Sequence, residues 1–105
     1  MKVFVVLVTT PNRAVSERLA KLAVGKKLAA CANIVPGLKS RYWWKGKVET
    51  AREELLVLKT HSTKLPKLQE ALRKNHPYSV CEILALPVAG GNPAYLKWIH
   101  QSLRK

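Results

Sequence analysis

The sequence predicts an α+β fold in which an antiparallel sheet is built in the order β-α-β-β-α-β and a further helix follows at the C-terminus. Three observations predict it: the chain opens with a β-branched apolar run, two long strand-like segments meet at Lys45-Gly46, and amphipathic helical stretches separate these strands from their neighbours. All 105 residues, 1–105, are expected to form one domain, because 48% of them are hydrophobic and can supply a core.

The first strand and the first helix are expected within the first 26 residues. Residues 2–9 are apolar at odd and even positions alike, which is typical of a central strand covered on both faces. Thr10 or Asn12 can then cap a helix that has Pro11 in its first turn. The apolar stripe of this helix recurs at helical spacing and consists of Val15, Leu19, Leu22 and Ala23.

The middle of the chain predicts a long hairpin. Residues 28–35 form an apolar strand, which Pro36-Gly37 breaks or bends. An extended segment leads from there to a turn at Lys45-Gly46, where glycine tolerates positive φ, and residues 47–59 return. So small a domain cannot cover an arm of this length, and the aromatic cluster near its tip implies a partner surface: Tyr42, Trp43 and Trp44.

The last third predicts a helix, a strand and a second helix. Ser62 is the expected N-cap of the first of these helices, which ends before His76-Pro77. Residues 80–88 predict the fourth strand, and Asn92-Pro93 begins the final helix. Two split β-α-β units around an antiparallel sheet give the ferredoxin-like arrangement.

The charge is unusual for a domain of this size. The chain has 19 lysines and arginines, six glutamates and no aspartate, which gives a net charge of +13. Such a charge favours non-specific association with polyanions, including nucleic acid. The basic residues are spread along the chain rather than gathered in one run, so a solvated cationic surface, a nucleic-acid face and a deliberately engineered surface all remain open.

Several separated blocks of sequence point to one family. They are Leu28-Ala29-Ala30-Cys31-Ala32-Asn33-Ile34, Tyr42-Trp43-Trp44-Lys45-Gly46-Lys47-Val48-Glu49, Leu58-Lys59-Thr60, His76-Pro77-Tyr78, Glu82-Ile83-Leu84-Ala85-Leu86-Pro87 and Tyr95-Leu96-Lys97-Trp98. In this order and spacing they resemble the CutA divalent-cation-tolerance family over almost the whole chain. The resemblance implies a ferredoxin-like protomer, a tight homotrimer, a link to tolerance of divalent metals, notably copper, and no accepted catalytic reaction.

The chain departs from the family at three points. Ser79 stands where the family usually has a carboxylate, Cys81 stands where it has proline or alanine, and acids are fewer around the hairpin and on the helices. The cationic surface would make the protomers repel one another, so a trimer must rest on apolar burial and strand pairing. A natural basic variant and a charge-engineered variant both fit these departures.

Cys31 and His76 are the candidate metal ligands. A thiolate is a soft ligand for copper, and a neutral imidazole binds many transition metals. The alternatives are a small buried thiol for Cys31 and a helix-capping histidine for His76. Both cysteines, Cys31 and Cys81, are expected as buried free thiols in strands, whereas His61 and His100 are expected at the surface.

The resemblance also points to a polar cleft between subunits formed by Glu49, Lys59, Tyr78 and Glu82. Lys59 ends one apolar strand and Glu82 begins another, so the two side chains are expected to pair across an interface or to bind a small anion. The expected anchors of the trimer interface are aromatic, because aromatic side chains bury a large area at small entropic cost: Tyr42, Trp43, Trp44 and Trp98.

The sequence therefore favours a trimeric protein of divalent-cation tolerance that binds Cu²⁺ or another divalent cation weakly, needs no cofactor and is not an enzyme. A catalytic triad of serine, histidine and aspartate cannot form without aspartate, and no phosphate-binding glycine loop is present. The alternatives are a polyanion-binding module and an engineered cationic scaffold. No apolar run is long enough to span a membrane, and a cytoplasmic location is expected.

Overall fold

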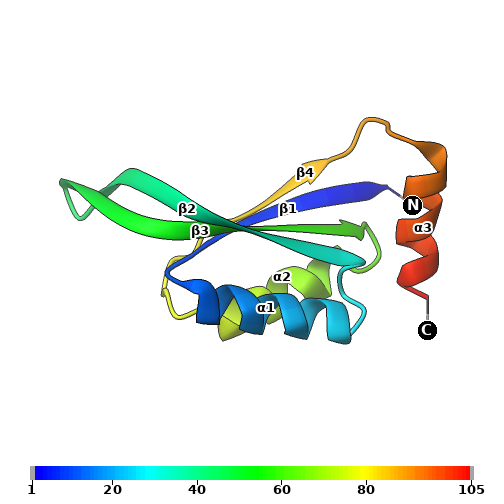
Figure 1. The fold of residues 1–105 in the computed structure, drawn as a ribbon, viewed down its shortest axis with the longest axis horizontal. Helices are drawn as coiled ribbons and strands as arrows, with labels where there is room; N and C mark the ends of the chain where they lie inside the picture. Colours follow the sequence, from blue (N-terminus) through cyan, green and yellow to red (C-terminus); the bar gives the residue numbers. More distant parts are fainter. Residues whose placement is uncertain (1, 105) are drawn as a thin grey trace.

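The computed structural model describes residues 2–104 and has the predicted element order (Figure 1). The strands are β1 (Val3–Thr10), β2 (Cys31–Trp44), β3 (Lys47–His61) and β4 (Ile83–Pro87). The helices are α1 (Arg13–Gly25), α2 (Leu65–Asn75) and α3 (Pro93–Ser102). The four strands form one antiparallel sheet in the order β2-β3-β1-β4, which confirms the predicted α+β, ferredoxin-like arrangement.

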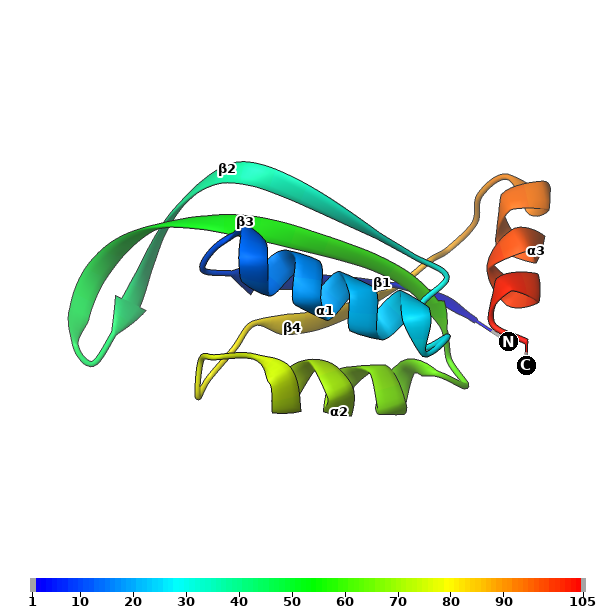
Figure 2. The same cartoon turned by 60° about the horizontal axis from the view of Figure 1, so that its bottom comes forward.

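The main core lies between the sheet and two helices on one of its faces. Figure 2 shows α1 and α2 side by side beneath the same face. Strand side chains alternate, and those that point to the helices are fully buried, as Val6, Val8, Leu56 and Leu58 are at 0% exposure. Residues 13–27 and 64–75, here called the helix layer, carry nine lysines and arginines and two glutamates, so the solvent side of this layer is strongly cationic.

The opposite face of the sheet is largely uncovered, which corrects the expectation that the first strand is covered on both faces. Directly paired residues share a face, and the register aligns Leu7 with both Val57 and Leu84. Leu84 is 55% exposed. We call the apolar residues of this side the open sheet face: Val5, Leu7, Val35, Leu55, Val57, Leu84 and Leu86.

The hairpin of β2 and β3 extends beyond the helices at the end of the molecule away from α3 (Figure 1). The predicted break at Pro36-Gly37 is a bulge, since the register shifts between Val35 and Leu38 while the strand continues. The turn is at Lys45-Gly46 as predicted, and both residues have positive φ, 49° and 78°. Positive φ at both central residues is the mark of a type I′ turn, whose twist matches that of the strands.

Two of the three expected helix caps are present. Asn12 Oδ1 accepts a hydrogen bond from Val15 N at 2.9 Å, and Asn92 Oδ1 accepts one from Ala94 N at 3.1 Å. The prediction that Ser62 caps α2 was wrong, because the cap position is Lys64, which makes no side-chain cap bond. Ser62 Oγ instead accepts a hydrogen bond from Lys2 N at 3.3 Å and so joins the start of β1 to the end of β3.

The fourth strand is shorter than predicted. It begins at Ile83, where the ladder with β1 ends at the pair Val8 and Ile83, so residues 80–82 lie outside the sheet. Cys81 is therefore in a connecting segment rather than a strand. Both thiols are free, as expected, but Cys31 and Cys81 are half-buried rather than buried.

The third helix packs at the other end of the sheet through a small cluster of its own. Ile99 and Leu103 contact Val3, and Ala30, Val88 and Leu96 pack around them. Val3 has the same parity as Val5 and Leu7, so α3 covers the end of the face that is otherwise open. Within residues 2–104 no helix is long and apolar enough to cross a membrane.

Candidate functional site

A groove of about 890 Å³ lies where the base of the hairpin meets the segment between α2 and β4. Part of its wall comes from β1 and the facing strands, and the rest from residues 78–82. Its lining residues are Thr9, Leu38, Ser40, Arg41, Tyr42, Trp43, Trp44, Glu53, Leu55, Tyr78, Ser79, Val80, Cys81 and Glu82. Aromatic rings, one guanidinium and two carboxylates therefore face one space.

Tyr78 and Glu53 form the buried polar contact of this groove. The Tyr78 hydroxyl donates a hydrogen bond to Glu53 Oε2 at 3.0 Å, and Glu53 is only 8% exposed. Burial, followed by the bond to Glu53, raises the pKa of Tyr78 to about 12. A buried carboxylate needs a donor, and Tyr78 supplies one from a segment distant in sequence. The contact fastens the segment after α2 to the hairpin.

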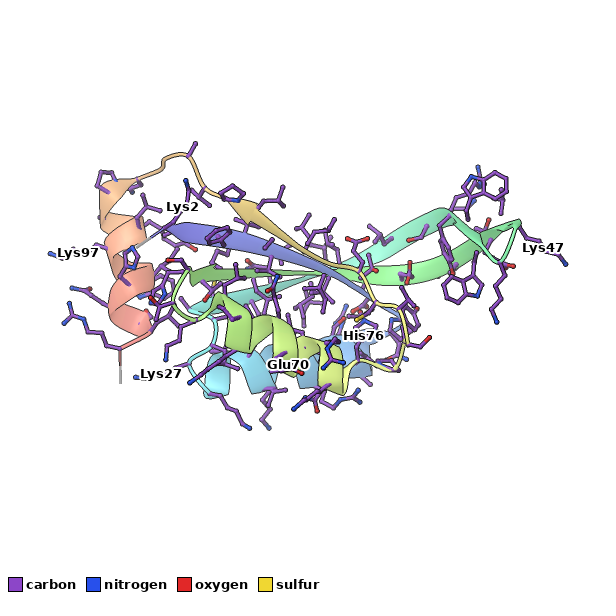
Figure 3. The ribbon with its side chains drawn as sticks, turned by 180° about the vertical axis from the view of Figure 1, so that it is seen from behind. Lys2, Lys27, Lys47, Glu70, His76 and Lys97 are labelled. Atoms are coloured by element: carbon purple, nitrogen blue, oxygen red, sulfur yellow. The ribbon has the colours of Figure 1, made fainter. Side chains whose placement is uncertain are left out.

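His76 is held by hydrogen bonds at both ring nitrogens. Tyr78 N donates to His76 Nδ1 at 3.1 Å, so Nδ1 carries no proton. The ring proton is then on Nε2, which lies 2.8 Å from Thr9 O and donates to it. His76 is 8% exposed, and Figure 3 shows it at the end of α2. A metal could bind this neutral ring only by displacing one of these bonds.

We expect Tyr78→Phe to remove one tyrosine from the titration phase near pH 12. Since the pKa of Tyr78 is raised above the usual value of 10.0, its phenol stabilises the fold fully below pH 10 and loses that effect as pH rises towards about 12. Phenolate absorbance measured against pH tests this, with the more exposed Tyr42→Phe as the matched control. An unchanged amplitude near pH 12 in Tyr78→Phe would contradict the assignment.

Cys31 lies at the opposite end of the sheet from His76. Cys31 pairs with Lys59 of β3, whereas Thr9, the contact of His76, pairs with Leu55. The Cys31 thiol shares a hydrogen bond with the Tyr95 hydroxyl of α3, Sγ to Oη 3.6 Å. This bond, followed by burial, raises the pKa of Tyr95. The two metal candidates of one chain therefore cannot bind the same ion.

The chain alone does not assemble a multidentate metal site from the residues described. Within residues 2–104, no three side chains of histidine, cysteine, aspartate or glutamate come together in a group that could hold a metal ion. A stable site for a divalent ion needs about three or four protein ligands. One chain thus offers single ligands, which suit weak binding or a site completed by another molecule.

The four residues expected in a polar cleft lie in three places. Tyr78 and Glu82 line the groove together. Glu49 faces Tyr42 across the outer part of the hairpin, and Lys59 donates a hydrogen bond to Asn33 Oδ1 near the end of the sheet that holds Cys31. Lys59 and Glu82 do not meet within one chain, because Lys59 aligns with Val5 while Glu82 precedes the residue aligned with Val8, and their pairing across an interface stays a prediction.

The aromatic residues expected at an interface are all exposed. Trp43 is 75% exposed, and Tyr42, Trp44 and Trp98 are each about 42–43% exposed. Trp98 stacks on Tyr95, with ring centroids 5.5 Å apart. The exposed aliphatic residues Leu84, Leu86 and Val35 of the open sheet face were not anticipated from the sequence. The two-sided apolar character of the strands was the signal that could have identified them.

Comparison with known proteins is consistent with this geometry. A family model described as CutA1 divalent ion tolerance protein matches residues 4–102. The chain belongs to the CutA1 family. Among its relatives, the chloroplastic protein CutA 1 of Oryza sativa is 52% identical over 96% of this chain and 57% of its own length. The divalent-cation tolerance protein CutA of Thermus thermophilus is 49% identical over 93% of this chain and 95% of its own length.

Solved CutA structures superpose closely on the chain. The crystal structure of CutA1 from Oryza sativa has a TM-score of 0.95 at 50% identity. The match covers 100% of this chain and 96% of the rice chain. The periplasmic CutA from Archaeoglobus fulgidus has a TM-score of 0.93 at 36% identity, covering 97% and 99% of the two chains. The family resemblance and the fold inferred from sequence are thereby confirmed.

The CutA relatives differ in length and in stated location. The chain spans about half the length of several plant and animal relatives, 57% of the rice protein and 53% of the mouse protein. Plant relatives are named chloroplastic and the Archaeoglobus structure is named periplasmic, so the family does not share one compartment and the cytoplasmic location stays a prediction. The polyanion-binding alternative gains no support from the family, which is described by its tolerance of divalent ions.

Proposed function

We propose that the protein acts, without catalysis, as a homotrimer in tolerance of divalent cations and binds copper or another divalent ion weakly. Membership of the CutA1 family supports the link to divalent ions. The observation that carries the proposal is the position of Cys31, whose neighbours across the sheet are Lys59, Val5 and Leu86. The thiol therefore shares a side of the sheet with the open sheet face.

The open sheet face supports the assembly. Val35, Leu84 and Leu86 are each 43–55% exposed, and they form one apolar surface with the half-buried Val5, Leu7, Leu55 and Val57. Monomeric proteins rarely leave an apolar surface of this extent in water. Both edge strands, β2 and β4, also offer unpaired backbone groups for pairing with another chain. Copies of this chain are the proposed partners. Because each copy carries a net charge of +13, the attraction between them must come from apolar burial rather than from charge.

Cys31 is the leading ligand candidate. Its thiol can bind a soft metal ion by exchanging only the long contact to Tyr95, whereas His76 would lose a well-formed bond at either nitrogen. An assembly that covers the open sheet face is one way to supply the further ligands that one chain lacks. Nothing in this arrangement prepares a nucleophile or a general base, so binding rather than turnover is proposed.

Metal titration of the wild-type protein and its Cys31→Ala variant tests this proposal. We expect anaerobic equilibrium dialysis against Zn²⁺, and separately against copper, to show weak binding to the wild-type protein. Cys31→Ala is expected to lower the metal affinity by more than the roughly 10–100-fold that loss of an outer-shell partner causes. Zn²⁺ is included because it does not oxidise thiols. Cys81→Ala, which removes the other half-buried thiol, is the matched control and is expected to bind as wild type does.

His76→Ala separates the two ligand candidates. Since both nitrogens of His76 are engaged, its replacement is expected to change the affinity less than Cys31→Ala does. Equal binding by wild type and Cys31→Ala would remove Cys31 from the proposal, and a larger loss in His76→Ala would transfer the role to that residue. No binding of either ion to the wild-type protein would contradict metal binding altogether.

A further inference from the structure

Two histidines from distant parts of the chain are stacked at the junction between the sheet and α3. His61 is the last residue of β3 and His100 belongs to the last turn of α3. Their ring centroids are 5.3 Å apart, with an interplanar angle of 23°. His61 is only 4% exposed and His100 is half-buried, which corrects the expectation that both lie at the surface. This pair takes no part in the groove or in the contact of Cys31.

Each ring has a buried nitrogen without a hydrogen-bond partner. His61 Nδ1 and His100 Nδ1 are both inaccessible to water, and neither has a partner among the described residues. Buried polar atoms in native proteins are nearly always paired, so two unpaired nitrogens in one contact need an explanation. A proton added to Nδ1 of either ring would lie on an atom that water does not reach and beside the other ring.

The surroundings of the pair oppose such a charge. Burial, followed by the effect of His100, lowers the pKa of His61; a backbone hydrogen bond partly opposes this shift and Lys64 adds to it. Lys2 lies beside the same strand end, where Ser62 N donates to its carbonyl oxygen at 2.8 Å. None of the six glutamates is among the interactions that shift His61, and α3 itself contains no acid. The charged side chains beside His61, Lys2 and Lys64, are therefore both cations.

A metal site is a poor account of the pair. Lone pairs of imidazole nitrogens lie in the ring planes, and nearly parallel stacked rings direct them side by side rather than towards one point. No carboxylate or thiol joins the two rings to make a group of three ligands within residues 2–104. Neighbouring lysines would also repel a cation.

The attachment of α3 is small enough for this contact to matter. The helix has ten residues, and its apolar anchor is the separate cluster of Val3, Ile99 and Leu103. Two polar contacts also join the C-terminal region to the rest of the chain: Tyr95 with Cys31, and Lys27 Nζ, which donates to the Arg104 carbonyl oxygen at 2.7 Å. Figure 1 shows α3 at the end of the sheet, apart from α1 and α2. It can therefore loosen without disturbing the main core.

We propose that the stacked His61–His100 pair is a pH-sensitive fastening that holds α3 on the sheet while both rings are neutral and loosens it when either ring is protonated. Loosening would uncover Val3 and the end of the open sheet face, and would separate Tyr95 from Cys31. The device is independent of metal binding, since its action follows from the charge of the two rings alone.

The direction of the effect follows from the position of the proton. His61 has a pKa near 6.5 when it is exposed in the unfolded chain, whereas burial lowers the pKa of His61 in the docked state. The docked state thus binds fewer protons below pH 6.5, so its stability is complete above that value and falls as pH decreases towards the lowered pKa.

Amide hydrogen exchange of the full chain, read by peptide, tests the proposal. After correction for intrinsic exchange rates, we expect protection of α3 to fall at least about tenfold from about pH 7.5 to about pH 5.0, while α1 and α2 keep theirs. The double variant His61→Gln, His100→Gln cannot take up the proton and is expected to lose this dependence. His76→Gln removes the remaining histidine and is expected to keep it.

Each outcome decides the matter. Equal protection of α3 at both pH values, or an unchanged pH dependence in the double variant, overturns the proposal. If the double variant does not fold, the histidine ring signals of the wild-type protein are titrated by NMR together with the α3 amides. A shared midpoint for His61 or His100 and the α3 amides supports the fastening, and separate midpoints overturn it.

Discussion

Leu84→Asp is expected to lower the mass in solution from that of three chains, about 35 kDa, to that of one, 11.8 kDa. Leu84 is 55% exposed in one chain, and its cross-strand neighbour Leu7 places it within the open sheet face. If copies of the chain cover this face, the substitution buries an unpaired carboxylate in every subunit. Each such burial costs several kcal/mol, which a contact between protomers that already repel one another cannot absorb.

Light scattering coupled to size exclusion, at low and moderate salt, gives the mass directly. Val24→Asp is the control, because it adds the same charge at a residue that is 40% exposed on α1, within the helix layer. We expect this variant to stay trimeric. A monomeric wild-type protein at every salt concentration would rule out the proposed assembly, and a trimeric Leu84→Asp would show that the open sheet face is not the contact surface.

Leu58→Ala is expected to cost about 2–5 kcal/mol of unfolding free energy, the largest stability effect that we predict for a single truncation. Leu58 is fully buried in the second half of β3, between Val6 of β1 and Ala32 of β2, and points into the core between the sheet and the helices α1 and α2. Removing three carbons there leaves a space that the close-packed neighbours cannot fill, so the lost contacts add to the lost burial.

Denaturant unfolding at one fixed protein concentration measures this effect, because assembly makes apparent stability depend on concentration. The control is Val24→Ala on the exposed side of α1, for which a change within about 0.5 kcal/mol is expected. A loss of less than about 1 kcal/mol in Leu58→Ala would mean that the core can close around the missing side chain.

Much of the fold was predictable because local chemistry and tertiary structure agree. Asparagine before a helical stripe predicted the starts of α1 and α3, and glycine at the hairpin turn predicted the reversal. Ser62 misled because a cap depends on where its side chain finds a donor, and a partner far away in sequence, Lys2 N, supplied it. The two-sided apolar run in β1 predicted cover on both faces, but the helices of this chain cover only one, because local sequence does not reveal how many elements pack on a sheet.

The candidate site was less predictable because its contacts join residues that sequence spacing cannot relate. Glu53 looks like any other acid of the hairpin, yet the structure buries it against Tyr78, which lies 25 residues further along. Sequence placed Lys59 and Glu82 at the ends of two strands, but in the structure Lys59 aligns with Val5 in the sheet while Glu82 precedes the start of β4. His61 was expected at the surface because the sequence does not show where α3 packs, and its burial depends on the contact with His100 of that helix.

The helices α1 and α2 have one face in the core and one in water, whereas the sheet has apolar residues on both faces, and this difference affects how the chain can evolve. A residue of β1 or β3 is constrained from both sides, by the core beneath it and by whatever covers the open sheet face. An exposed residue of α1 or α2 is constrained from one side only, so most substitutions there change stability little. Surface charge can therefore change in either direction on these helices while the sheet and its core stay the same, and a chain can become as cationic as this one without any change of fold.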